Sequence, residues 1–169
     1  DNVISLGTLD YRRGEDGWQF SLDPDGVDPV LKKPTIKSVY NYSEPNYEGP
    51  YSVPALVDLK TEKIVRKESA EILHEFATIF KPLHKEGAID LYPKSLAKQI
   101  DEWNEKLAVA VNDGVYGMGF AKTQDEYDLA FNRFFDALDE VEERLSNQRY
   151  INGNSITETD IRFYTTMIR

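Results

Sequence analysis

Two stretches in the second half of the chain repeat apolar residues at the spacing of an amphipathic helix. In the first, Leu96, Ile100, Trp103, Leu107 and Val111 recur three or four positions apart, which places them on one helical face. The second stretch follows the same spacing, with acidic residues between the apolar ones: Tyr127, Phe131, Phe134, Leu138, Val141 and Leu145. Stripes of this kind are most often core. We therefore predict two long helices that pack through these faces.

A third helix is indicated near Thr157. Thr157 with Asp160 three residues later resembles a capping box, and Ile156 and Ile161 are spaced as a hydrophobic staple. No stop signal follows before Arg169. We interpret Asp160 as part of a folding device and do not assign it a catalytic role.

The pattern in the first half of the chain is mixed. Residues 3–9 favour a strand, and residues 12–29 are rich in Gly, Asp and Pro and indicate a loop. Apolar residues at helical spacing predict a short helix in residues 34–42. The apolar run at residues 52–57, a polar turn and the run Lys63–Arg66 predict a β-hairpin, followed by a helix from Ser69 to Phe80.

These elements predict an α/β part followed by an all-α part. We expect an α/β part in residues 1–80, a linker in residues 81–94 that contains Pro82, Gly87 and Pro93, and a helical domain in residues 95–169. Such an order of elements indicates two small domains or one compact domain with two halves.

The dipeptide Val53-Pro54 stands at the start of the predicted hairpin. Proline cannot donate to a strand ladder, so it is expected at the strand's beginning, and a cis peptide bond there would leave the N–H and C=O of Val53 for an outside partner. At the other end of the hairpin, Glu68-Ser69 opens a helix whose first N–H groups attract a carboxylate. A free strand edge, an acid for an ammonium group and a helix start for a carboxylate suit an extended peptide with an α-amino acid head, such as glutathione.

Each of these residues also has a purely structural interpretation. Glu68 alone would be read as a solvated acid in the first turn of a helix, where the helix dipole favours it. Ser69 can be a cap, a ligand contact or both. Trp18 either covers a ligand or fills a gap between domains, and Tyr116 either lines a pocket through its phenol or packs between helices.

An ordered set of short motifs runs through the chain. It begins with Gly17-Trp18, continues through the hairpin and Glu68-Ser69, and then includes residues 112–116, 149–153 and 156–162. In this order the motifs resemble those of the glutathionyl-hydroquinone reductases, also called the Xi class of glutathione transferases and related to the Omega class. The resemblance covers about residues 3–169.

The resemblance implies a glutathione transferase-like architecture with a truncated thioredoxin-like part and a helical domain. It implies glutathione as cosubstrate and no metal. Glutathione-binding residues would be Trp18, Val53, Pro54, Glu68 and Ser69, and Tyr116 would line the pocket for a quinone-type substrate. Members of this family reduce glutathionyl-hydroquinones through a cysteine thiolate, by thiol–disulfide exchange.

The chain contains no cysteine, and so the thiolate of that chemistry cannot come from these residues. We expect the segment that carries it to lie before residue 1 and the end of the helical domain to lie after residue 169. The alternative is a non-catalytic structural or regulatory subunit of a larger complex. Pro50, where the family usually has an arginine, is compatible with that alternative.

Charge and composition argue against several classes of binding partner. The net charge of −10 argues against binding to nucleic acid phosphates, and no apolar run is long enough to cross a bilayer. The two histidines, His74 and His84, are ten positions apart without a metal-ligand pattern. We expect a small-molecule enzyme or subunit in the cytoplasm, with a plastid or mitochondrion as the alternative, that assembles as a homodimer or in a larger complex.

Overall fold

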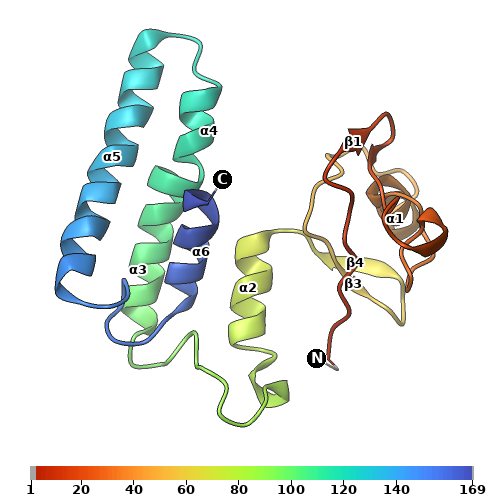
Figure 1. The fold of residues 1–169 in the computed structure, drawn as a ribbon, viewed down its shortest axis with the longest axis horizontal. Helices are drawn as coiled ribbons and strands as arrows, with labels where there is room; N and C mark the ends of the chain where they lie inside the picture. The colour runs from red at the N-terminus through yellow and green to blue at the C-terminus, as the bar shows by residue number, and fades with distance from the viewer. Residues whose placement is uncertain (1–2, 169) are drawn as a thin grey trace. The chain divides into compact units, whose positions relative to one another are not determined.

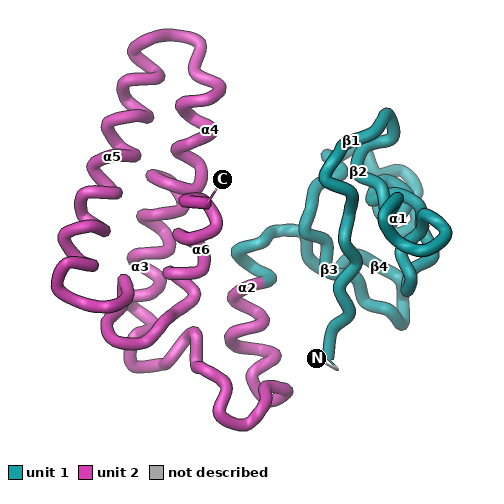
Figure 2. Tube along the Cα trace, viewed as in Figure 1, with its two compact units in different colours: residues 1–72 teal, residues 73–169 magenta. Residues whose placement is uncertain are grey.

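The structure is a computed structural model that describes residues 3–168. Contacts divide it into two compact units, Asp1–Ile72 and Leu73–Arg169 (Figure 2). The first unit contains two small sheets and a helix, and the second is helical (Figure 1). The predicted class, α/β followed by all-α, is confirmed. The predicted domain limits at residues 80 and 95 stay a prediction.

The hairpin of the first unit consists of β3 (Leu56–Asp58) and β4 (Lys63–Arg66), which pair antiparallel with a bulge after Leu56. Its turn is closed by Asp58, whose carboxylate accepts from the N–H of Lys60 at 2.9 Å and from the hydroxyl of Thr61 at 2.8 Å. Aspartate is favoured in such turns because its side chain bonds the backbone two residues on. The predicted hairpin is confirmed.

Helix α1 (Ile36–Ser43) covers this hairpin, and its contacts include β4 and β2. It begins two residues later than predicted because Thr35 is its N-cap: the hydroxyl of Thr35 accepts from the N–H of Ser38 at 3.0 Å. The core of the unit is a cluster of apolar side chains from α1 and the preceding loop: Phe20, Ile36, Val39 and Tyr40. The predicted loop at residues 12–29 carries a second hairpin, β1 (Arg13–Gly14) with β2 (Gly17–Trp18), and a 3₁₀ turn, η1 (Pro24–Gly26).

The strand predicted in residues 3–9 is wrong. This segment is irregular, and three of its apolar side chains, Val3, Ile4 and Leu6, are exposed, Leu6 by 87%, while Leu9 is half-buried against the core cluster. A strand needs a partner for its backbone groups, and the strands of the described chain pair as two separate hairpins. β-propensity alone is therefore not enough to order this segment.

The second unit is built on α3 (Ala97–Leu107), which continues through a π-helical segment, η3 (Ala108–Asn112), to α4 (Gly114–Gly119). Ile100, Leu107 and Val111 of the predicted stripe are at most 1% exposed, and so the prediction of a core-facing helix is confirmed. The single helix predicted to residue 111 is interrupted, however, because the widened turn of a π-helix replaces its last part.

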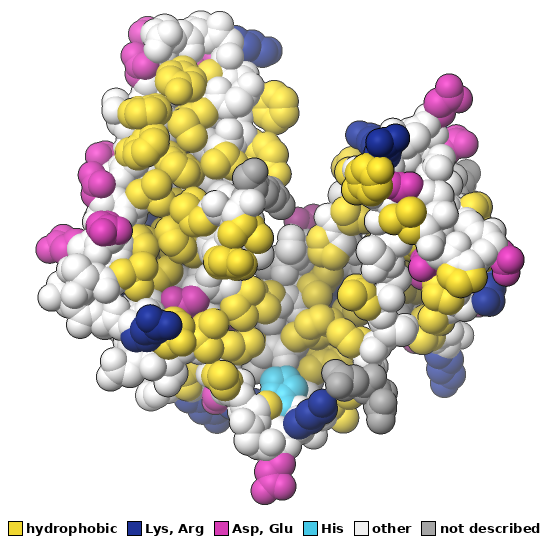
Figure 3. Space-filling model, in the orientation of Figure 1, with side chains coloured by type: hydrophobic (Ala, Val, Ile, Leu, Met, Phe, Trp, Pro, Cys, Tyr) yellow, Lys and Arg dark blue, Asp and Glu magenta, His cyan; other side chains and the backbone are white. Residues whose placement is uncertain are grey.

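Helix α5 (Gln124–Asn147) contains the whole predicted stripe but does not bury all of it. Phe134 and Val141 are buried, whereas Tyr127, Phe131 and Leu145 are 38–39% exposed. Figure 3 shows the resulting band of hydrophobic side chains on the surface of this helix. The prediction that the whole stripe is core is therefore wrong. The stripe lies on one face, but α5 has 24 residues whereas its neighbours α4 and η3 have 6 and 5, and Tyr127 and Leu145 lie near the two ends of α5.

The remaining helices are α2 (Ser69–Ala77), the 3₁₀ turn η2 (Lys81–Leu83) and α6 (Glu158–Met167). Helix α2 starts at the predicted residue and ends three residues early, since Pro82 cannot continue a helix. At the start of α6, Asp160 accepts from the N–H of Thr157 at 2.8 Å, which confirms that half of the predicted capping box. Within residues 3–168, none of the helices is long and apolar enough to span a membrane.

Candidate functional site

The end of the β3–β4 hairpin brings the two predicted motifs together. Leu56 pairs with Arg66 across the hairpin. Pro54 lies two residues before Leu56, and Glu68 lies two residues after Arg66, and so both motifs leave the same end of the antiparallel pair. The peptide bond between Val53 and Pro54 is cis, as predicted.

Val53 offers an unpaired stretch of backbone. Its N–H and C=O make no hydrogen bond within residues 3–168, and its side chain is 45% exposed. The neighbouring Ser52 differs, because its carbonyl accepts from the hydroxyl of buried Tyr40 at 2.9 Å. The chain is thus tied to the core of the unit at residue 52 and free to pair with an extended ligand at residue 53.

Glu68 and Ser69 form the other half of the site. Both are exposed. The backbone carbonyl of Glu68 accepts from the N–H of Ile72 at 3.0 Å and so opens α2. Within residues 3–168 the carboxylate of Glu68 has no ion pair and the hydroxyl of Ser69 makes no hydrogen bond. Both side chains are thus open to a ligand, and the role of Ser69 as a cap, a ligand contact or both stays a prediction.

The other predicted residues are placed elsewhere. Trp18 lies on β2 in the first unit, where it is half-buried against the core cluster of Phe20 and α1. Tyr116 lies on α4 in the second unit, is 49% exposed and stacks on Phe120 with ring centroids 6.3 Å apart. The structure thus brings together Val53, Pro54, Glu68 and Ser69, and the ligand roles of all six residues stay predictions.

A hollow of about 180 Å³ between the end of α1 and β4 was not predicted. It is lined in part by Tyr47 and Lys67, and Lys67 stands directly before Glu68. The ammonium group of Lys67 donates to the hydroxyl of Tyr47 at 3.3 Å and lies 5.3 Å from the centre of its ring. The hydrogen bond to Tyr47 raises the pKa of Lys67, and so its positive charge persists beside the site. The two residues are 20 positions apart, and no local pattern marks the pair.

Comparison with known proteins identifies the group. The family model of the glutathione S-transferase C-terminal domain matches residues 124–169. Glutathione S-transferase omega-like 2 of Schizosaccharomyces pombe is 37% identical over 100% of this chain and 56% of its own length. Glutathionyl-hydroquinone reductase YqjG of Escherichia coli is 38% identical over 98% of this chain and 51% of its own length.

Comparison with solved structures points to the same family. A glutathione transferase from Gordonia bronchialis superposes with a TM-score of 0.94 at 43% identity, over 100% of this chain and 53% of that one. The glutathione-bound structure of YqjG gives a TM-score of 0.86 at 38% identity, over 96% of this chain and 53% of that one. The chain belongs to the glutathione transferase family, in the group formed by the Xi class and the glutathionyl-hydroquinone reductases. It spans about half the length of the curated relatives it matches.

Proposed function

We propose that this chain supplies the glutathione-binding part of a glutathione-dependent reductase that acts on glutathionyl-hydroquinones. The proposal rests on two groups that have no partner within residues 3–168 and that lie at the same end of the β3–β4 hairpin. These groups are the free backbone of Val53 and the free carboxylate of Glu68, followed by the start of α2.

The chemistry of glutathione matches these groups one by one. The cysteinyl residue of glutathione has one N–H and one C=O, which pair with the C=O and N–H of Val53 as in β-strand addition. The α-ammonium group of its γ-glutamyl residue pairs with the carboxylate of Glu68. The neighbouring α-carboxylate accepts from the hydroxyl and N–H of Ser69 at the helix N-terminus. Lys67 adds a positive charge that attracts an anionic ligand to an otherwise acidic chain.

The reaction then proceeds by sulfur exchange. A thiolate attacks the glutathione sulfur of a glutathionyl-hydroquinone. The carbon–sulfur bond breaks, its electron pair and a proton go to the ring carbon, and the hydroquinone leaves. A mixed disulfide with glutathione remains, which a second glutathione thiolate resolves to give glutathione disulfide and the starting thiolate. These 169 residues contain no cysteine, and so their part in the reaction is to bind and orient glutathione. Trp18 would cover the ligand, and Tyr116 would donate to an oxygen of the quinone-type ring.

Glutathione titration of the intact gene product that carries this chain tests the proposal. Binding is measured by calorimetry for the wild type, Glu68→Gln and Ser69→Ala. We expect each substitution to raise the glutathione Kd by roughly tenfold, since a hydrogen bond that involves a charged group contributes about 1.5–3 kcal/mol. Glu68→Gln removes the negative charge that pairs with the ammonium group, and Ser69→Ala removes the hydroxyl that donates to the carboxylate. Each substitution should change the stability of the ligand-free protein by less than about 1 kcal/mol, because neither side chain has a hydrogen-bond partner in residues 3–168 and the exposed charge of Glu68 acts only on the helix start and on Lys67.

Matched controls come from the second unit. Glu105→Gln and Ser95→Ala make the same chemical changes at exposed positions on and before α3, and both should bind glutathione as the wild type does. Absence of binding by the wild type at millimolar glutathione would overturn the proposal and favour a non-catalytic subunit. Equal losses in the Glu68 and Glu105 variants would show that net charge, and not the site, is responsible.

A further inference from the structure

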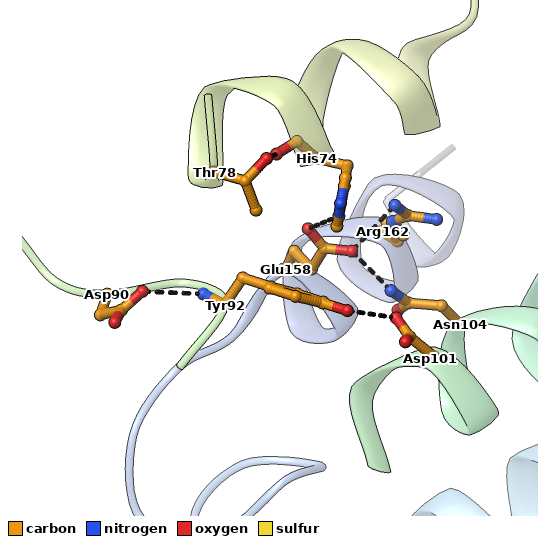
Figure 4. Close-up of polar contacts among 8 residues, drawn as sticks. All are labelled: His74, Thr78, Asp90, Tyr92, Asp101, Asn104, Glu158 and Arg162. Atoms are coloured by element: carbon orange, nitrogen blue, oxygen red, sulfur yellow. Dashed lines mark hydrogen bonds and ion pairs between the residues drawn. The ribbon is translucent and has the colours of Figure 1, made fainter. Parts of the chain in front are cut away.

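A carboxylate lies at the centre of the second unit. Glu158, the first residue of α6, is fully buried. Its Oε1 accepts from Nδ2 of Asn104 at 2.6 Å and from the guanidinium of Arg162 at 2.9 Å, and its Oε2 faces Nδ1 of His74 at 3.2 Å (Figure 4). Its backbone N–H donates to the carbonyl of Leu91 at 3.0 Å. One side chain thus joins α2, α3 and α6.

The carboxylate of Glu158 determines the orientation of the Asn104 side-chain amide. Asn104 is buried and turns its amide nitrogen to Glu158, which leaves its own Oδ1 without a partner in the described chain. The opposite orientation would place two acceptors against each other. A buried carboxylate is costly unless several donors surround it, and here a guanidinium and an amide do so in addition to His74.

His74 connects α2 to this hydrogen-bond network. Its ring stands edge-on to the ring of Tyr92, with centroids 4.6 Å apart and an interplanar angle of 84°. The hydroxyl of Tyr92 donates to Asp101 at 2.8 Å. Burial, followed by the hydrogen bond to Asp101, raises the pKa of Tyr92 to about 12, so its phenol stays protonated. The imidazole is therefore held on one side by a fixed ring and on another by Glu158.

We propose that Glu158 is a positioning residue for the glutathione site and that it acts through His74. This inference rests on the proposed function, because Glu68 and Ser69 stand at the start of the same helix, α2. His74 lies five residues after Ser69, about 7.5 Å along the helix axis. A helix of nine residues is too short to be stable by itself. Its buried residues are Ile72 and Ala77, whose apolar contacts resist sliding less than a directed hydrogen bond does.

The hydrogen bond between His74 and Glu158 constrains the position of a helix more narrowly than apolar packing does. Apolar packing tolerates small shifts of a helix, whereas a hydrogen bond fixes distance and direction. Binding groups must be held within about 0.5 Å of their productive positions, and this precision depends on the residues behind them. Loss of the bond between His74 and Glu158 should therefore loosen the first turn of α2 and weaken glutathione binding, although neither residue touches the ligand.

Two measurements on the intact gene product test this role. Amide hydrogen exchange of Ile72, whose N–H donates to the carbonyl of Glu68 at 3.0 Å, reports without glutathione how often the first turn of α2 opens. Calorimetry gives the glutathione Kd. We expect His74→Leu, which has no donor, to speed exchange of the Ile72 N–H by about tenfold and to raise the glutathione Kd by about five- to tenfold. His74→Asn places an amide nitrogen near the position of Nδ1 and should restore both values to within about twofold of the wild type.

Asn112→Leu is the matched control. Asn112 lies in η3 and donates to the carbonyl of Arg162 at 3.1 Å and to the hydroxyl of Thr166 at 2.5 Å. Its loss removes hydrogen bonds from the same unit without touching α2, and so it should lower stability but leave the glutathione Kd and the exchange of the Ile72 N–H unchanged.

Several outcomes would overturn the inference. They are wild-type exchange in His74→Leu, an unchanged Kd despite faster exchange, the absence of rescue by His74→Asn, and an equal Kd change in Asn112→Leu. If the wild type itself binds no glutathione, the proposed function fails, and with it the positioning role. The exchange data then still show whether Glu158 anchors α2.

Discussion

Asp58 shows how one carboxylate shapes the turn that holds the candidate site together. The N–H of Lys60 and then the hydroxyl of Thr61 lower the pKa of Asp58 from its ordinary value of 3.8, because both bonds favour the charged form. The folded hairpin thus prefers ionised Asp58. The contribution of ionised Asp58 to stability is present above the pKa of Asp58 in the unfolded chain, about 3.9. It is lost as the pH falls through the lower pKa of Asp58 in the folded protein.

Thr61→Val removes one of these bonds and tests the effect. We expect the pKa of Asp58, measured by NMR titration of its carboxyl carbon, to move up toward 3.8. The variant should be less stable than the wild type at pH 7, and this difference should shrink as Asp58 becomes protonated at low pH. Thr61→Ser keeps the hydroxyl and should behave as the wild type. An unchanged pKa in Thr61→Val would show that the bond to Thr61 contributes nothing.

For single residues, the sequence predicts those features that depend on neighbouring positions in the chain. The cis peptide before Pro54 and the start of α2 at Ser69 were both predicted, because proline and helix-start preferences act locally. The contact between His74 and Glu158 was not, since the residues are 84 positions apart. The pattern showed only that His74 lacks a metal-ligand spacing, which says nothing about a carboxylate in another helix.

Among the elements, α5 shows where helical periodicity stops being informative. The pattern gives the helix and its approximate apolar side, but Phe134 is 8% exposed and Phe131 is 38% exposed. The difference comes from the neighbours. Phe134 packs in the core cluster with Leu107 and Val111 and approaches Gly114 of α4, whereas Phe131 contacts the rings of Tyr127 and Phe135 on its own helix. Burial is thus decided by a second element, which the pattern of the first does not reveal.

Truncation of these two rings separates core from surface. Phe134→Ala should lower the free energy of unfolding by about 3–5 kcal/mol, because it leaves a cavity among packed side chains. Phe131→Ala should cost about 1 kcal/mol or less, the usual worth of an aromatic pair on a helix surface. Urea denaturation of both variants measures the difference, and similar m-values would show that the denatured states are comparable. Equal costs would mean that the surface ring is covered in solution.

On the scale of the whole molecule, the sequence predicts the order of elements better than their limits. The α/β part precedes the helical part, as hydrophobic periodicity indicated. The contact-based division falls at residues 72 and 73, inside α2, whereas a pattern of Gly and Pro marks only breaks in secondary structure. A boundary that falls inside a helix has no such mark. It has to be read from contacts such as the one between His74 and Glu158, which lies within the second unit.

Charge is the other property of the whole molecule, and it is distributed unevenly. Helix α5 carries eight acidic and two basic residues, which is −6 of the net charge of −10. Ion pairs elsewhere are mostly exposed, such as Lys98 with Glu102 at side-chain exposures of 92% and 65%, and such pairs contribute little. Repulsion along α5 should thus be the larger effect. Asp139 and Glu143 are one example, because residues four apart lie on the same helical face.

Two opposite substitutions on α5 test this repulsion. Asp139→Asn removes three like-charge pairs, with Asp136, Glu142 and Glu143, and should raise the free energy of unfolding at 10 mM salt by about 0.2–0.5 kcal/mol for each pair. Asn132→Asp places a new charge four residues from both Asp128 and Asp136 and should lower the free energy of unfolding by about 0.2–0.5 kcal/mol for each of these two pairs. In 1 M salt the screening length falls from about 30 Å to about 3 Å, and both effects should nearly vanish. Urea titrations at the two salt concentrations measure them. Differences that persist in 1 M salt would show that helix propensity, and not charge, separates these variants from the wild type.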